Sequence, residues 1–140
     1  MPRSTTTLTL SDAKRMLEAG EGKAAIFGVA YNIAVVDAGG ALMAFVRQDN
    51  ALVGSIDLAI GKAVTARLFD KTTAYLAELA QPGAPLFGIA ASNGGKVVIF
   101  GGGLPVRVGD TIVGAVGASA GTIEQDIAVA EAAAAAVSVN

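Results

Sequence analysis

Residues 32–47 read NIAVVDAGGALMAFVR, two apolar, strand-forming runs separated by the short stretch DAGG. β-Branched and aromatic residues favour strands, and the two glycines can adopt the positive φ angles that a tight turn between strands requires. We therefore expect strands near 31–37 and 41–47. Because a parallel pair needs a crossover of a dozen or more residues, two strands joined this closely must be antiparallel.

Two further turns carry similar signals. GD at 109–110 separates LPVRV from TIVGAVGAS, and SNGG at 92–95 separates LFGIA from KVVIF. Each pattern predicts another hairpin, so the segments 86–90 and 96–100 are also expected to be strands.

Helix signals occur between and around these hairpins. Thr9 with Asp12, and Thr122 with Gln125, have the spacing of a capping box, in which two side chains satisfy free N–H groups at a helix start. Helices segregated to the faces of an antiparallel sheet predict an α+β layer fold, with residues 1–140 as one domain. The helices are expected at about 10–25, at 55–69, from Thr72 to before QPG at 81–83, and from Thr122 to about 138.

The chain has few charged residues. It is 53% apolar and 16% charged, with ten basic and twelve acidic residues mixed along 140 positions. It lacks the basic stripe that nucleic-acid binding requires, so nucleic acid is excluded as a partner. The longest weakly polar run, AAIFGVAYNIAVV, has 13 residues and is too short to cross a bilayer. The N-terminus lacks the apolar stretch of a secretion signal, so we expect a cytoplasmic protein. So few charges also predict burial between the subunits of a homo-oligomer.

Cysteine and histidine are both absent. This excludes disulfides, thiol chemistry, Cys/His zinc sites and imidazole acid–base catalysis. The acidic residues show no convincing spacing for a metal ion, so no metal site is expected. Haem would need an axial donor of another type, and Met16 and Met43 fall on predicted apolar faces, where they are better explained as core residues. The other candidate donors are Met1, Tyr31 and Tyr75.

The stretch FGGGLPV at 100–106 resembles a nucleotide-binding loop only superficially. Val106 stands where a dinucleotide-binding fingerprint needs its last glycine, and a strand-like run follows where that fingerprint needs a helix. The Gly–Lys pairs of the chain lack the hydroxyl residue and the leading glycine of a phosphate-binding P-loop. Two interpretations stay open. The glycines either form a kinked connection, or leave bare backbone against which a ligand or a neighbouring subunit lies.

A set of polar residues surrounds the second predicted helix. Arg47 ends a strand and Ser55 begins the helix that carries Lys62, so these side chains could converge on a carboxylate or phosphate. The alternative is that Lys62 belongs to a solvated helix face, paired with Asp57 or beside Arg67. Gly61 costs a helix about 1 kcal/mol, which indicates close packing at this position. The full set is Arg47, Asp49, Ser55, Asp57, Lys62 and Arg67.

Four segments together resemble the GlcG/HbpS-like proteins, also called the DUF336 family, which are related to the C-terminal domain of PduO-type corrinoid adenosyltransferases. They are VVDAGGALMAFVR, SIDLAIGKAVTA, VVIFGGGLPV and IVGAVGASAGTIEQDIAVA. The resemblance implies a profilin-like α+β domain with a central antiparallel sheet, assembled into dimers and often octamers. The matching positions are Asp37, Gly40, Arg47, Ser55, Lys62, Gly102, Gly103, Pro105, Gly114, Gly121 and Asp126.

The function that this resemblance implies is less uniform than the fold. Some members bind haem or iron, others belong to catabolic operons, and a few are linked to small carboxylate intermediates. Because the chain has no histidine, a histidine haem ligand cannot be carried over to any position.

Our leading hypothesis is an oligomeric protein that binds a small molecule, anionic or carboxylate in character, as an accessory to a catabolic pathway. Backbone N–H groups would bind the ligand and the cations would offset its charge. The residues expected at the ligand are Arg47, Lys62, Phe100, Gly101, Gly102, Gly103 and Pro105.

Three alternatives remain. The first is an enzyme of tautomerase, deaminase or hydrolase type, with Lys62 as general base or nucleophile and Asp57 or Asp126 moving protons. The second is haem or iron binding, as in some members of the family. The third is a purely structural role without a ligand, because each glycine also has a packing explanation.

Overall fold

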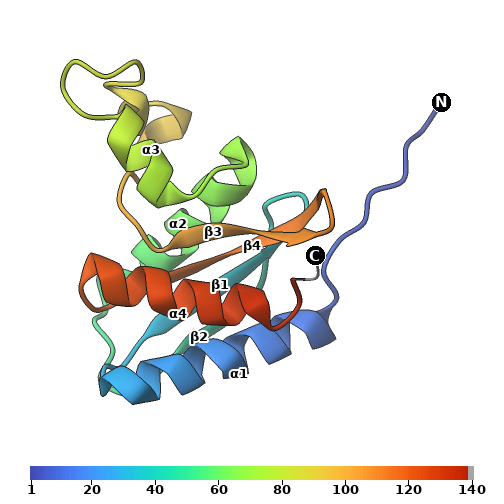
Figure 1. The fold of residues 1–140 in the computed structure, drawn as a ribbon, viewed down its shortest axis with the longest axis vertical. Coiled ribbons are helices and arrows are strands. Elements are labelled where there is room, and N and C mark those ends of the chain that lie inside the picture. The colour runs from blue at the N-terminus through green and yellow to red at the C-terminus, as the bar shows by residue number, and fades with distance from the viewer. Residues whose placement is uncertain (139–140) are drawn as a thin grey trace.

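The computed structural model describes residues 1–138 and contains helices on both faces of one sheet (Figure 1). Among these residues, four strands form an antiparallel sheet in the order β2-β1-β4-β3. The α+β prediction is therefore confirmed. The helices are α1 (Leu10–Phe27), α2 (Ser55–Phe69), α3 (Thr73–Leu79) and α4 (Ile123–Ala135), and the strands are β1 (Asn32–Asp37), β2 (Leu42–Arg47), β3 (Gly103–Val108) and β4 (Thr111–Ser119).

The helices begin where local chemistry predicts. Both capping boxes are present, at Thr9 for α1 and at Thr122 for α4, and Thr72 caps α3 by accepting a hydrogen bond from the backbone N–H of Tyr75. Helix α1 ends at Gly28, whose φ of 68° places it in the left-handed region that favours glycine at a helix end.

The two faces of the sheet are covered differently. Helices α1 and α4 pack on one face, where Ile33, Val35 and Val116 are completely buried. Helix α2 packs on the other face, against Ala34 and Ala115. Figure 1 shows α1 and α4 in front of the sheet and α2 behind it. Large aliphatic residues thus form the first interface, and small residues form the second.

The predicted hairpin around SNGG is wrong. Ile89–Ala91 and Asn93–Gly95 form short 3-10 helices, and 86–100 contains no strand. Gly88, Gly94 and Gly95 have φ of 95°, 70° and 76°, which interrupt an extended backbone. The segment instead follows α2, because the N–H of Val98 donates to Thr65 Oγ1 over 3.1 Å.

One end of the sheet collects the glycine stretch and the polar residues. We call it the glycine end; it comprises the starts of β1 and β3 at Asn32 and Gly103, and the ends of β2 and β4 at Arg47 and Ser119. Because α4 begins just after β4, its first turn also lies here. Within residues 1–138, no helix has both the length and the apolar character needed to cross a membrane.

Candidate functional site

Lys62 is completely buried, so it does not belong to a solvated helix face. It lies on the sheet-facing stripe of α2, together with Ser55, Ala59 and Ala63. Its Nζ donates to the carbonyl oxygen of Ala118 over 2.9 Å and to Asp126 Oδ2 over 2.7 Å. Since α2 and α4 cover opposite faces of the sheet, this side chain connects the two layers at the glycine end.

Asp126 is the centre of the buried network. Its Oδ1 accepts from the hydroxyl of Tyr31 over 2.7 Å and from the backbone N–H groups of Ala120 and Gly121 over 3.2 and 2.9 Å. Its Oδ2 accepts from Lys62. Four donors therefore share the two oxygens of one carboxylate. The buried ion pair is thus held by hydrogen bonds from Tyr31, just before β1, from α2 and from the β4–α4 connection.

The environment shifts the pKa values of the two residues whose side chains donate to Asp126. Burial lowers the pKa of the Lys62 ammonium, while the hydrogen bond and the negative charge of Asp126 oppose this effect. Burial raises the pKa of the Tyr31 hydroxyl well above its usual range, and Asp126 raises it further. Tyr31 therefore remains a neutral hydrogen-bond donor at neutral pH.

The glycine stretch makes room for Lys62. A Cβ on Gly102 would lie 2.6 Å from the carbonyl oxygen of Ala118 and 2.8 Å from Lys62 Nζ, and its φ of 125° is also unsuited to other residues. A Cβ on Gly101 would lie 2.7 Å from Cδ1 of Ile127. The Gly103 N–H donates to Thr73 Oγ1 over 2.9 Å. The three glycines thus pack against the buried lysine, α4 and α3.

Beside these glycines lies a small cavity of about 250 Å³. Phe100 is close by, with its ring centroid 5.0 Å from Lys62 Nζ, and 36% of this residue is exposed. The ammonium group therefore lies over the ring in a cation–π arrangement. The cavity is lined by Thr72, Ala74, Gly102, Gly103, Leu104, Ile127 and Glu131.

The other polar residues singled out in the sequence do not converge on Lys62. Arg47 is exposed at the end of β2, which lies two strands from β4. Asp57 is exposed as well, since five helical residues separate it from Lys62 by about 140° around α2. Arg67 pairs with Asp70 at the far end of the helix. Asp49 lies exposed after β2, whereas Ser55 is buried.

Asp57 lies instead in a different groove. This groove has a volume of about 660 Å³ and runs between α2 and the segment that precedes β3, with Asp57 and Lys96 as its charged residues. Gly61 lies on its floor, where a Cβ would come within 2.9 Å of Val98 Cγ2, so the expected close packing at this glycine is present.

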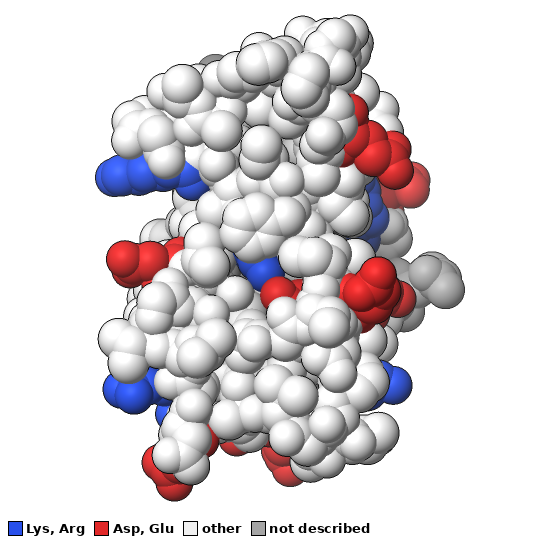
Figure 2. Space-filling model, turned by 90° about the vertical axis from the view of Figure 1, so that its left-hand side faces the viewer, with Lys and Arg blue, Asp and Glu red and all other residues white. Residues whose placement is uncertain are grey.

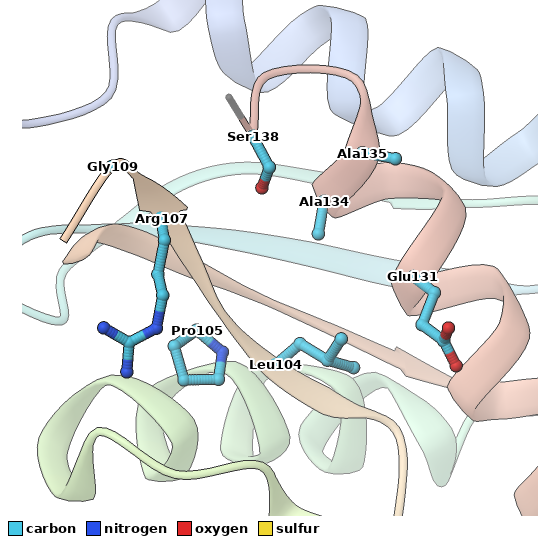
Figure 3. A pocket seen from close by; sticks show the side chains of 8 residues that line it. All are labelled: Leu104, Pro105, Arg107, Gly109, Glu131, Ala134, Ala135 and Ser138. Carbon is cyan, nitrogen blue, oxygen red and sulfur yellow. The ribbon is translucent and has the colours of Figure 1, made fainter. Parts of the chain in front are cut away.

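A third groove, of about 350 Å³, lies between β3 and the C-terminal half of α4. Figure 3 shows Arg107 and Glu131 well apart on its two sides, with Leu104 and Pro105 between them. Its charged groups do not point toward one another in this view. Pro105 therefore lies on the edge strand and lines this groove, whereas the hydrogen bonds of Lys62 go to Ala118 and Asp126.

Sequence reasoning misses the central role of Tyr31 and the carbonyl of Ala118. The sequence presents Tyr31 only as a possible haem donor, although a buried tyrosine usually needs a hydrogen-bond partner for its hydroxyl. No sequence signal identifies a backbone carbonyl as a lysine partner. In the part of the chain that the structure describes, no group of three or more Asp and Glu side chains could hold a metal ion.

Comparison with known proteins gives consistent results. Residues 8–135 match the family model described as haem degrading protein HbpS-like. The chain is 44% identical over 125 residues to an uncharacterized 15.0 kDa protein from the dhaT–dhaS intergenic region of Citrobacter freundii, covering 89% of this chain and 88% of the relative. It is 36% identical over 140 residues to the corrinoid adenosyltransferase PduO of Salmonella typhimurium, covering 99% of this chain but only 42% of that enzyme.

Among solved structures, the PduOC–haem complex superposes with a TM-score of 0.91 at 35% sequence identity, covering 96% of this chain and 98% of that one. The sequence match and the structural match each extend over almost the whole chain. This chain belongs to the HbpS-like (DUF336) family.

Proposed function

We propose that the protein binds a small molecule through a carboxylate or another strong acceptor at Lys62, as an oligomeric accessory to a catabolic pathway. The observation that carries this proposal is an unused donor. A lysine ammonium has three N–H groups, and Lys62 gives two of them to Ala118 and Asp126. Among residues 1–138, Nζ has these two hydrogen-bond acceptors, and it also lies over the ring of Phe100, which is not a conventional acceptor. A ligand oxygen that replaced this ring contact would form a charge-assisted hydrogen bond in a low-dielectric site.

The surroundings suit a ligand with an apolar part. Large apolar residues are exposed on the segments that meet at the glycine end, namely Leu52, Val53, Phe100 and Ile123. Figure 2 views the molecule from the side on which α4 begins, and uncharged atoms cover most of its centre, with basic atoms recessed beside acidic ones. Exposed apolar groups around a polar centre are typical of binding and subunit interfaces. This arrangement supports both a small-molecule ligand and assembly into an oligomer.

The relatives support an accessory role in metabolism. One is encoded between dhaT and dhaS, and another is a corrinoid adenosyltransferase of which this chain matches about two-fifths. A protein of this kind would hold or deliver a small molecule for neighbouring enzymes.

Haem, which a relative binds, does not fit the residues of this site. Met16 is completely buried in the core, the hydroxyl of Tyr31 donates to Asp126, and Lys62 is held in an ion pair. None of these three can act as an axial donor without breaking the core or the network. Met43 packs against the core, and Tyr75 lies on the outside of α3. We therefore propose a small acidic ligand in place of haem.

Native mass spectrometry of the purified protein, compared with the same sample after denaturation, tests the proposal. We expect a closed oligomer and a releasable acidic molecule, or, if it is empty, saturable binding of straight-chain carboxylates by calorimetry. Lys62→Met should lose this binding, whereas Lys96→Met, which removes an exposed lysine, should keep it. A haemin titration should give no saturable Soret shift.

Because Lys62→Met leaves Asp126 unpaired, the double variant Lys62→Met/Asp126→Asn provides a second test in which no buried charge remains. Carboxylate binding that survives in a folded double variant would contradict the proposal.

A second candidate function is acid–base catalysis on a small carboxylate. The lowered pKa of Lys62 favours it, because burial makes the neutral amine more accessible, and Asp126 and Tyr31 could relay a proton. Asp57 is too far around α2 to take part. Keto–enol interconversion of phenylpyruvate, followed by ultraviolet absorbance, checks this function. Turnover that is lost in Lys62→Met and kept in Asp57→Asn would support it, and no turnover in the wild type would exclude it for this substrate class.

A further inference from the structure

We propose that a second, polar subsite at the glycine end, formed by Asn32, Ser55 and Ser119, binds a hydroxyl or amino group of the ligand. The inference rests on the proposed function, because it concerns the same ligand and the same end of the sheet. It goes beyond that function by naming a second chemical group that the ligand must carry.

Asn32 provides the central observation. This residue is 0% exposed, and its Nδ2 donates to the carbonyl oxygen of Leu52 over 2.9 Å. That carbonyl can only accept, so the amide nitrogen must face it and the amide oxygen must face the other way. Oδ1 then has no hydrogen-bond donor among the described residues. Buried side-chain oxygens nearly always have a donor, so Oδ1 marks a place where a donor is missing.

Two serines lie on the elements next to Asn32. Ser119 on β4 is the register partner of Asn32 on β1, so their side chains emerge on the same, α2-covered face of the sheet. The backbone N–H of Ser55 donates to the same Leu52 carbonyl over 3.1 Å, which places the start of α2 beside the Asn32 amide. Ser55 and Ser119 are almost completely buried, and a serine hydroxyl can either donate or accept. Together the three side chains can bind a group that both donates and accepts, such as a hydroxyl.

The subsite adjoins the Lys62 network along the chain. Tyr31 directly precedes Asn32, the first residue of β1, and Ser119 follows Ala118 on β4, so each of these chain segments contributes neighbouring residues to the two sites. Ser55 and Lys62 share the buried stripe of α2, two turns apart. A ligand that reached from Lys62 to Asn32 would therefore carry an acidic group at one end and a hydroxyl or amine at the other.

On the edge strand β2, Arg47 is the register partner of Asn32. A series of ω-hydroxycarboxylates with three to eight carbons, each compared with the unsubstituted carboxylate of equal length, tests the inference by isothermal titration calorimetry. We expect the hydroxyl to strengthen binding at least tenfold at one chain length, the length at which it reaches Asn32. At that length, Asn32→Leu should abolish the gain, so that the variant binds the hydroxylated and the unsubstituted acid equally. Ser119→Ala should reduce the gain, and Ser92→Ala, at an exposed serine, should not.

The outcomes separate the two proposals. Unsubstituted acids that bind in a Lys62-dependent way, with no gain from the hydroxyl at any length, would overturn the subsite and leave the proposed function intact. Absence of binding by both series would contradict the proposed function as well. Should Asn32→Leu fail to fold, a crystal structure with the tightest hydroxy acid decides: its oxygen must lie within hydrogen-bond distance of Asn32 Oδ1. A water molecule there in place of the ligand hydroxyl would overturn the inference.

Discussion

The two faces of the sheet achieve burial in different ways. On the face covered by α1 and α4, large side chains such as Ile33 and Val116 fill the space between layers. On the face covered by α2, alanines and a glycine bring the helix backbone almost into contact with the strands, since a Cβ on Gly117 would lie 2.6 Å from the backbone nitrogen of Ala63. Burial of large side chains stabilises the first face, and close packing of backbone against backbone stabilises the second.

This difference explains how a charged residue can be buried in so small a protein. Close approach of α2 to β4 places the stem of Lys62 beside Gly117, and the glycines before β3 leave a path for its ammonium toward α4. Larger residues on this face would hold α2 farther away and leave the ion pair with Asp126 open to water. We therefore expect loss of side-chain volume to destabilise the protein at the α1/α4 face. At the α2 face, we expect added side-chain volume or the loss of a charge to destabilise it.

Removal of the Lys62 ammonium is expected to have the largest effect. Lys62→Met should lower the free energy of unfolding by about 3–5 kcal/mol, because it leaves the Asp126 carboxylate buried and without its cation. Urea denaturation at neutral pH measures this loss. Lys62→Met/Asp126→Asn should recover most of it, since the amide oxygen that replaces the carboxylate can still accept from Tyr31. Equal stability of the single and double variants would show that the charges are not coupled in the folded protein.

Addition of one methyl group to the α2 face comes next. Gly117→Ala should destabilise the protein by about 2–3 kcal/mol, because the new Cβ meets backbone atoms of α2 that cannot move independently. Gly20→Ala is the matched control on the other face. There the new Cβ would lie 2.8 Å from Ile33 Cδ1, the flexible end of a side chain, and alanine improves helix propensity by up to about 1 kcal/mol. Similar losses in both variants, measured by thermal unfolding, would contradict the proposed contrast between the faces.

Features set by local signals can be predicted from the sequence, whereas features set by contacts between layers cannot. Strands β1 to β4 and the helix starts follow from local signals, because a turn such as DAGG or a cap such as Thr122 acts within a few residues. The segment 86–100 carries equally apolar runs, but its glycines adopt positive φ and its valines pack on α2, which no local pattern reveals.

Only part of the candidate site can be predicted from local signals in the sequence. Gly61 correctly indicates close packing, yet the burial of Lys62 depends on a carboxylate 64 residues away in sequence and on a carbonyl of β4. Sequence proximity groups Arg47 and Asp57 with Lys62, whereas the strand order and helix rotation separate them. The burial of Lys62 and its separation from Arg47 and Asp57 both depend on contacts between layers, which sequence periodicity does not encode.

Loss of one methyl group from the α1/α4 face should have a smaller effect. Ile33→Val should lower the free energy of unfolding by about 1 kcal/mol, because it leaves a small cavity among the residues of α1 and α4. Ile26→Val, at an exposed position of α1, is the matched control and should change stability by less than about 0.5 kcal/mol. Chemical denaturation resolves this difference. An effect at Ile33 no larger than at Ile26 would mean that volume does not stabilise this face.

The smallest expected effect is a change in the free energy of unfolding at alkaline pH. It arises from Tyr31, which donates to Asp126, the partner of Lys62 from the other face. The unfolded chain ionises this tyrosine above about pH 10, whereas burial and Asp126 raise its pKa and keep it neutral in the folded protein. The folded state then binds more protons than the unfolded state, so stability falls as the pH rises through this range. The contribution at pH 10.5 is about 0.8 kcal/mol for one group that ionises at pH 10 only when unfolded.

Lys62 acts in the opposite direction, because its lowered pKa makes stability rise with pH up to its ordinary range, so the wild type alone does not isolate the tyrosine. Comparison with Tyr31→Phe removes the Lys62 contribution, provided that the ion pair is retained in both proteins. The stability advantage of the wild type over Tyr31→Phe should therefore shrink between pH 8 and pH 10.5. A constant difference over this range would show that the Tyr31 hydroxyl ionises as readily in the folded protein as in the unfolded chain, and hence that water reaches the Asp126 network.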